Sequence, residues 1–153
     1  VQTCALPIYL PRGRINFAGH PLTSSLLHAD DQDWQPALDG LSRIIEMAKG
    51  AGARVVIAYY PDLLQLYADG LGAGSLERDA AVQAHSNGVR RLREFTTEKA
   101  VDFLDYTPAL WAANRDRQVT ETDTDYHPND FGVEVMVNSV LPIISELIRR
   151  PPS

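Results

Sequence analysis

Residues 54–61, which read Arg-Val-Val-Ile-Ala-Tyr-Tyr-Pro, decide the fold. The middle of this stretch is apolar at every position. It lacks the alternation of polar and apolar residues that marks a strand with one solvent-exposed face. A short strand that is apolar on both faces is typical of a parallel sheet covered by helices on both sides. Pro61 ends the strand because proline has no backbone donor. The stretch therefore predicts an α/β fold with parallel strands and a strand that is buried on both faces.

A helix is predicted before this strand, over residues 33–49. Asp33 suits the N-cap position, Pro36 is tolerated near the start, and Gly50 ends the helix. Apolar residues recur every three or four positions and form one stripe: Trp34, Leu38, Leu41, Ile45 and Ala48. A helix, a glycine turn and a buried strand together form one unit of a doubly wound sheet.

A second unit follows, with a helix over residues 76–99 and a strand over residues 101–104. We interpret His85, which lies on the apolar stripe of that helix, as a semi-buried structural residue. Asp105 comes directly after the strand and is expected to cap a short helix over residues 109–113. A last helix over residues 130–149 has a predicted buried stripe: Val133, Met136, Val140, Ile144, Leu147 and Ile148.

Length and charge limit the classes of partner. A chain of 153 residues predicts a single domain. A formal charge of -6 and a pI near 5.1 give no basic surface for nucleic acid, so a nucleic-acid partner is not expected. We also expect no membrane span, because the apolar runs are short.

The first eight residues, Val-Gln-Thr-Cys-Ala-Leu-Pro-Ile, resemble the translation of a sequencing-library adapter, and residues 1–8 are expected to be an artefact of a metagenomic fragment. The only cysteine, Cys4, lies in this segment, so no disulfide and no thiolate metal site are expected. Residues 9–150 are expected to form the C-terminal part of one domain, followed by a tail at 151–153. The compartment cannot be read from such a fragment.

The candidate site is residues 123–132, which read Asp-Thr-Asp-Tyr-His-Pro-Asn-Asp-Phe-Gly. Asp125 and His127 are two residues apart, so in extended backbone their side chains lie on the same side. Pro128 favours that extended conformation at His127. An imidazole oriented by a carboxylate is the general-base half of a nucleophilic triad. In the alternative interpretation the segment is only a turn, with Asn129 or Asp130 capping the next helix.

With Gly132 and the apolar helix after it, this segment resembles the last conserved block of the SGNH (GDSL-type) serine esterases and lipases. The resemblance covers roughly residues 33–148, but only this block is a specific motif. It implies a partial flavodoxin-like three-layer fold whose N-terminal strands are missing, with His127 as base and Asp125 as acid. The commonest family spacing would put the aspartate at Thr124, so Asp123 also remains a candidate acid. Branches related to polysaccharide O-acetyl transferases use the shorter spacing found here.

The resemblance implies a lipase-like ester hydrolase that acts on small-molecule or carbohydrate acyl esters, without a metal or an organic cofactor. Its serine block is absent from this sequence, so the fragment alone is expected to be inactive. In the family the stretch after the first predicted strand often borders the substrate pocket, so Tyr60 and Tyr67 are expected to line it, or else to anchor a solvent-facing loop. The alternatives are an O-acetyltransferase of the same fold and a noncatalytic α/β module. The family resemblance favours a secreted or periplasmic location.

Overall fold

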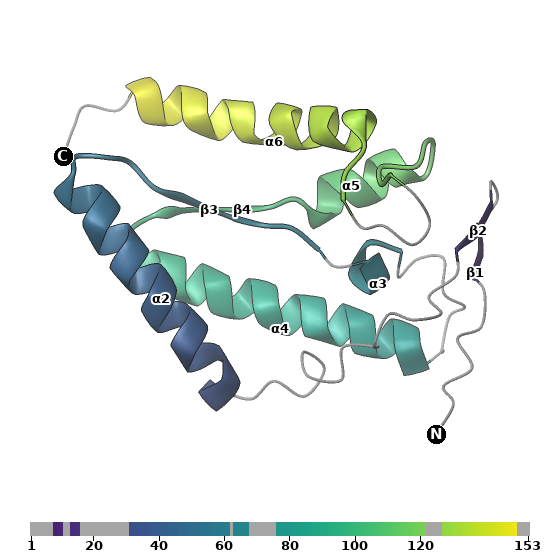
Figure 1. Cartoon of the computed structure of the whole chain (residues 1–153), viewed down its shortest axis with the longest axis horizontal. Helices are drawn as coiled ribbons and strands as arrows, with labels where there is room; N and C mark the ends of the chain where they lie inside the picture. The colour runs from purple at the N-terminus through teal and green to yellow at the C-terminus, as the bar shows by residue number, and fades with distance from the viewer. Residues whose placement is uncertain are drawn as a thin grey trace.

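The computed structural model describes residues 8–10, 13–15, 31–61, 63–67, 76–121 and 127–149. Asp123 and Asp125, the two candidate acids, lie outside the described residues. Figure 1 shows the elements, which in chain order are β1 (Ile8–Leu10), β2 (Gly13–Ile15), α2 (Asp31–Gly50), β3 (Val56–Tyr59), α3 (Leu63–Leu66), α4 (Leu76–Glu98), β4 (Asp102–Asp105), α5 (Thr107–Asn114) and α6 (Asp130–Arg149).

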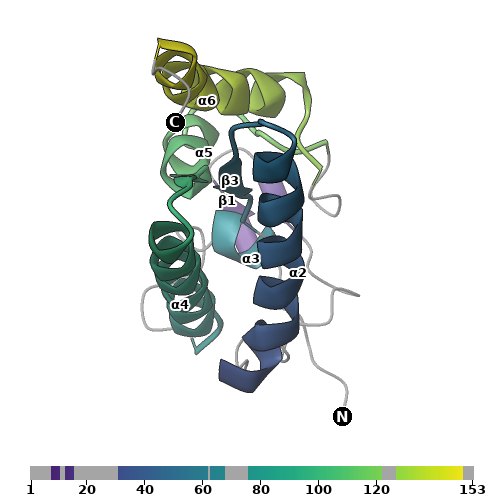
Figure 2. The same ribbon diagram turned by 90° about the vertical axis from the view of Figure 1, so that its left-hand side faces the viewer.

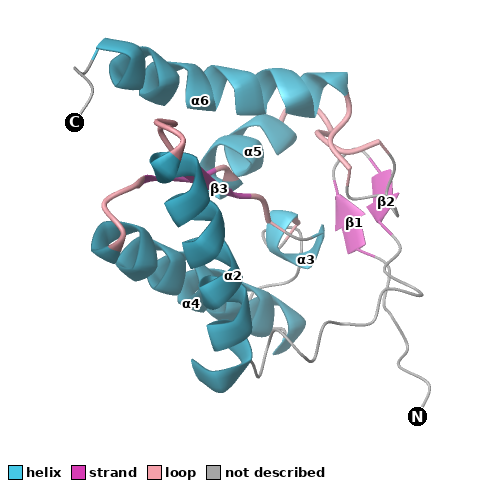
Figure 3. Ribbon diagram, turned by 60° about the vertical axis from the view of Figure 1, so that its left-hand side comes forward, coloured by secondary structure: helices cyan, strands magenta, loops and turns pink. Residues whose placement is uncertain are grey.

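Strands β3 and β4 form a parallel sheet, in register from Val56 opposite Asp102 to Tyr59 opposite Asp105. This pairing confirms the prediction of a mixed α/β fold with parallel strands. Strands β1 and β2 form an antiparallel hairpin, which the sequence analysis did not predict. The hairpin lies apart from β3 (Figure 3).

Helices lie on both sides of the parallel sheet (Figure 1): α5 and α6 on one side, and α2 and α4 on the other. The amine of Lys49, at the end of α2, donates hydrogen bonds to the carbonyls of Lys99 (2.6 Å) and Ala100 (3.2 Å), just after α4. The predicted stripe of α2 is buried or half-buried and is confirmed. The predicted apolar stripe of α4 is confirmed in the same way: Val82, His85, Val89, Leu92 and Phe95. Helix α2 begins at Asp31, so the prediction that Asp33 is its N-cap is wrong; several acidic residues here suit a helix N-terminus.

The prediction that β3 is buried on both faces is also wrong. Ala58 is exposed, and the other residues of the strand are half-buried. The physical reason is that, among the described residues, β3 pairs with β4 alone. A strand at the side of a two-stranded sheet lacks the neighbours that would cover its outer edge.

The predicted stripe of α6 is correct only in part. Met136, Val140 and Leu147 are half-buried, whereas Val133, Ile144 and Ile148 are 47%, 40% and 77% exposed. The reason is that α6 is apolar over most of its circumference and only part of it meets the core. That core consists of Leu66, Tyr67, Tyr106, Leu110 and Val119, and the α6 residues that pack against it are Phe131, Val135, Met136 and Val140.

Helix α6 is long and apolar enough, by length and composition, to cross a membrane, and 6% of its most apolar 18-residue window is buried. Length and composition carry little weight on their own, because a core helix can satisfy both. The exposed residues of α6 nevertheless form an apolar surface that the described residues leave open.

Candidate functional site

His127 lies on a turn that is held by backbone hydrogen bonds. The amide of Glu121 donates to the carbonyl of His127 (2.9 Å), and the amide of Asn129 donates to the carbonyl of Val119 (3.0 Å). These bonds flank an antiparallel bridge between Thr120 and Pro128. The side chain of His127 is exposed. The carbonyl of His127 and the backbone that follows it are thus held in place, while the side chain of His127 is exposed.

Asn129 ties this turn to the start of α6. Its side-chain amide donates to the carbonyls of Gln118 (3.0 Å) and Thr120 (2.8 Å), and its side-chain oxygen accepts from the amide of Gly132 (2.9 Å). A side-chain oxygen that accepts from the third helical amide is the geometry of an N-cap. Asn129 therefore has the capping role that the alternative interpretation predicted for it.

Gly132 is fixed by close packing. A Cβ atom at this position would lie 2.1 Å from the carbonyl oxygen of Val119 and 3.1 Å from the Cβ of Pro128. Real Cβ atoms do not approach a backbone oxygen so closely. The first turn of α6 can therefore rest against the 118–120 segment only because residue 132 is glycine.

The two candidate pocket residues occupy different environments. Tyr67 is 2% exposed, and its hydroxyl is 2.7 Å from the hydroxyl of Thr120. Tyr67 thus contacts the Thr120–Pro128 bridge from the side of the core. Tyr60 is half-buried and packs against the core. The assignment of both residues to a substrate pocket stays a prediction.

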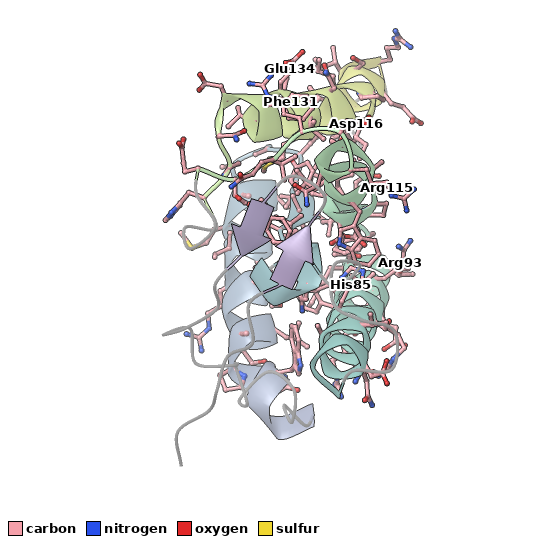
Figure 4. The ribbon with its side chains drawn as sticks, turned by 90° about the vertical axis from the view of Figure 1, so that its right-hand side faces the viewer. His85, Arg93, Arg115, Asp116, Phe131 and Glu134 are labelled. Atoms are coloured by element: carbon pink, nitrogen blue, oxygen red, sulfur yellow. The ribbon has the colours of Figure 1, made fainter. Side chains whose placement is uncertain are left out.

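A second histidine lies at the carboxyl ends of β3 and β4, where sites form in open α/β sheets. The Nε2 atom of His85 is 3.5 Å from Oδ2 of Asp105, and the two side chains are 13% and 12% exposed. The Nδ1 atom of His85 is 3.5 Å from the hydroxyl of Thr107, and the amide of Thr107 donates to Oδ1 of Asp105 (2.9 Å). In Figure 4, His85 lies where α4 meets α5.

Aromatic residues enclose the His85 ring. The centroids of Tyr59 and Trp111 lie 5.7 Å and 5.6 Å from it. Both aromatic residues also reach Gln65: the hydroxyl of Tyr59 donates to its side chain, and the indole of Trp111 donates to its carbonyl (2.7 Å). With each ring nitrogen facing a partner, His85 is placed as a structural residue, in agreement with the sequence interpretation.

The pairing of His85 with Asp105 was not predicted. The only signal in the sequence is that Asp105 follows a predicted strand, at the sheet edge where polar side chains gather. Asp105 was expected to cap a helix at residues 109–113; the helix begins at Thr107, and Asp105 binds the amide of its first residue. Tyr106, between them, is buried, and burial raises the pKa of its hydroxyl.

Among the described residues, no group of three or more histidine, cysteine, aspartate or glutamate side chains is placed to hold a metal ion. Comparison with protein-family models, with curated proteins and with solved structures found no match. The geometry of the His127 turn and the motif that contains it are the features that bear on function.

Proposed function

We propose that His127 is the general base of an SGNH-type ester hydrolase, and that this chain is the C-terminal part of its flavodoxin-like domain. Asp125 orients the imidazole, and a serine on a polypeptide segment outside residues 9–150 is the nucleophile. The single observation that carries the proposal is the bracing of the His127 turn, which fixes the backbone and leaves the imidazole exposed. A general base needs this combination of a fixed position and access to its substrate.

Three sets of contacts support the bracing. The bridge at Thr120 and Pro128 fixes the turn from one side, and the side chain of Asn129 fixes it to two carbonyls and to α6. Tyr67 fixes Thr120 from the core. Supporting contacts of this kind keep a catalytic side chain within the small tolerance that proton transfer requires.

The chemistry is acyl transfer in two steps. The serine oxygen attacks the ester carbonyl carbon while His127 takes the serine proton, and the tetrahedral intermediate collapses as the bond to the alcohol oxygen breaks. His127 gives its proton to the leaving alkoxide. Water then attacks the acyl-enzyme with His127 again as base, and the carboxylic acid and serine are released. The substrate class is an acyl ester of a small alcohol or a carbohydrate, and the steps need no cofactor.

One observation favours a noncatalytic α/β module as the second candidate. Capping accounts for Asn129, and close packing accounts for Gly132, without any chemistry. Neither role uses the imidazole of His127. The side chain of His127 therefore separates the two candidates.

The test compares this chain with a longer protein that includes the coding sequence upstream of Tyr9, using p-nitrophenyl acetate. We expect hydrolysis by the longer protein only, and a loss of about a thousandfold or more in His127→Ala. His28→Ala, a second histidine substitution, is the matched control and should keep full activity. Asp125→Ala and Asp123→Ala then identify the acid. Full activity in His127→Ala would reject the proposal, and turnover that requires an added sugar acceptor would identify an acetyltransferase.

A further inference from the structure

We propose that Gln65 is a positioning residue for His127. Gln65 fixes the short helix α3, and α3 holds the His127 turn through Tyr67 and Thr120. The effect on catalysis rests on the proposed function. The link between α3 and the turn does not rest on it, so a failure of the one can be told from a failure of the other.

Gln65 is a buried amide, and its burial needs an explanation. Its side chain is 3% exposed, whereas glutamine side chains are mostly found at protein surfaces. Burial of an amide costs free energy unless its polar atoms form hydrogen bonds. An apolar side chain of the same length would avoid that cost. The position therefore uses the polar atoms of glutamine.

Two other elements bind Gln65. The hydroxyl of Tyr59, the last residue of β3, donates to Oε1 of Gln65. The indole of Trp111, in α5, donates to the carbonyl of Gln65 (2.7 Å). Figure 1 and Figure 2 show α3 at a height between α4 and α5, and α3 contacts both helices. One residue thus ties α3 to the end of the sheet and to a helix on one side of the sheet.

Helix α3 depends on such ties because it consists of a single turn, Leu63–Leu66. An isolated helix of this length is not stable in water, so contacts with the rest of the chain must set its position. Leu66 is 2% exposed and anchors α3 in the core. Apolar burial is not directional, whereas a hydrogen bond is. The bonds of Gln65 therefore fix the rotation of α3, which burial alone leaves open.

Tyr67 connects α3 to the His127 turn. It follows shortly after Gln65, it is 2% exposed, and its hydroxyl is 2.7 Å from the hydroxyl of Thr120. Thr120 is fully buried, and the next residue, Glu121, donates its amide to the carbonyl of His127 (2.9 Å). A rotation of α3 would move the Tyr67 hydroxyl away from Thr120. The hydrogen bond at His127 would then lose its support from the core.

Such a displacement matters for a general base because proton transfer requires a narrow geometry. A misplacement of about 1 Å can lower the rate about a hundredfold. Residues that support a site from outside keep the reacting groups within that tolerance. The competing role for Gln65 is stabilisation of the core alone. That role predicts a loss of stability with no selective effect at the turn.

The first test uses this chain labelled with ¹⁵N and follows the exchange of two amides with solvent. The amide of Ile45, a buried residue of α2, reports global unfolding, and the amide of Glu121 reports the turn. Gln65→Met keeps the length of the side chain but lacks the acceptor for Tyr59. We expect the ratio of the Glu121 rate to the Ile45 rate to rise about tenfold in Gln65→Met. Gln35→Met, the same change at an exposed position of α2, is the matched control and should leave the ratio unchanged.

Further variants follow the link residue by residue. Tyr67→Phe lacks the hydroxyl that reaches Thr120 and should raise the same ratio, whereas Thr120→Ser keeps a hydroxyl and should not. Gln65→Met combined with Tyr67→Phe should give no larger ratio than Tyr67→Phe alone, because both changes break one link. Trp111→Phe removes the other tie to Gln65 and should raise the ratio too, so it decides the point even if Gln65→Met does not fold. An unchanged ratio in Trp111→Phe and Gln65→Met, or additive effects in the double variant, would overturn the inference.

The second test measures catalysis in the longer protein that includes the sequence upstream of Tyr9. We expect Gln65→Met to lower kcat for p-nitrophenyl acetate about tenfold with KM unchanged, counted per serine that reacts with a fluorophosphonate. Gln35→Met should keep full kcat. An unchanged kcat per reactive serine in Gln65→Met would overturn the positioning role, because a loss of folded protein alone lowers only the number of reactive serines. Full activity in His127→Ala would reject the proposed function and the positioning role with it, while the exchange ratios still decide the link between α3 and the turn.

Discussion

The two histidine regions of this chain are held in opposite ways. At His127 hydrogen bonds hold the carbonyl of the residue and the backbone that follows it, and the imidazole is exposed. At His85 the imidazole itself is enclosed, between two aromatic rings and beside Asp105 and Thr107. The difference shows that the position of His85 is set by packing of its ring, whereas the position of His127 is set by hydrogen bonds of its backbone. Substitutions should separate the two cases.

We expect the largest loss of stability from a substitution at Gly132, where the first turn of α6 packs against the 118–120 segment. In Gly132→Ala the new Cβ would lie 2.1 Å from the carbonyl oxygen of Val119, so the turn and α6 must move apart. We expect the free energy of unfolding in urea to fall by about 3 kcal/mol.

The matched control for this substitution is Gly40→Ala in α2, where a Cβ would have no neighbour within 4 Å. Alanine is the better helix former, so the control should stabilise by about 0.5 to 1 kcal/mol. If Gly132→Ala were as stable as Gly40→Ala, the turn would not be braced against α6.

Asn129→Ala should have the next largest effect, because it removes the N-cap of α6 and the two bonds to the 118–120 segment. We expect a loss of about 2 kcal/mol in urea unfolding, with faster hydrogen exchange at the amide of Glu121. Asn129→Ser keeps a capping oxygen but lacks the donors to Gln118 and Thr120, so its loss should be smaller than that of Asn129→Ala. Equal exchange rates at the Glu121 amide in all three proteins would show that Asn129 does not hold the 118–120 segment in place.

Substitution of the two histidines should lower the stability by less than the changes above. His85→Ala should destabilise the chain, and His127→Ala should leave its stability almost unchanged. His85→Ala removes the ring that packs on Tyr59 and Trp111 and leaves Oδ2 of Asp105 without its histidine partner, at a cost of about 1 to 2 kcal/mol. His127→Ala changes an exposed side chain and should stay within about 0.5 kcal/mol of the unmodified chain. Thermal unfolding of both variants checks the order, and a reversed order would remove the distinction between the two regions.

The smallest expected effect is a pH dependence near the His85 region. Burial raises the pKa of Tyr106 above its ordinary value of 10.0, so the folded state favours the neutral phenol. The contribution to stability is complete below pH 10 and is lost as the pH rises through the folded-state pKa. We expect the free energy of unfolding to decrease above pH 10, with a shallower decrease in Tyr106→Phe. Identical slopes in the two proteins would show that Tyr106 is not responsible.

The sequence was sufficient to locate α2, α4, α6 and β3, but not the β1–β2 hairpin or α3, and not what covers each element. Periodicity located α2, α4 and α6, and an unbroken apolar run located β3, because these signals are local. Exposure of Ala58 and Ile148 could not be predicted, since periodicity says which residues share a face and not what packs on that face. The pairing of His85 with Asp105 joins residues twenty positions apart on different elements, and only the packing of α4 on β4 brings them together.

The candidate site, like the fold, was predictable only in part. The motif around His127 located the turn, and the capping role of Asn129 followed from residue type and position. The contact between Gly132 and Val119 was not predictable, because it depends on how the 118–120 segment folds back onto α6. The hydroxyl contact of Tyr67 with Thr120 inside the core was not predicted, while its expected place beside a substrate pocket stays a prediction.

The most direct test of the His127 proposal is labelling with a fluorophosphonate, which reacts only with a serine that a base has activated. The longer protein that includes the sequence upstream of Tyr9 is treated and then analysed by mass spectrometry. We predict one phosphonylated serine outside residues 9–150 in the unmodified protein and in His28→Ala, and no labelling in His127→Ala. Equal labelling in His127→Ala, or none in the unmodified protein, would contradict the role of His127 as the base.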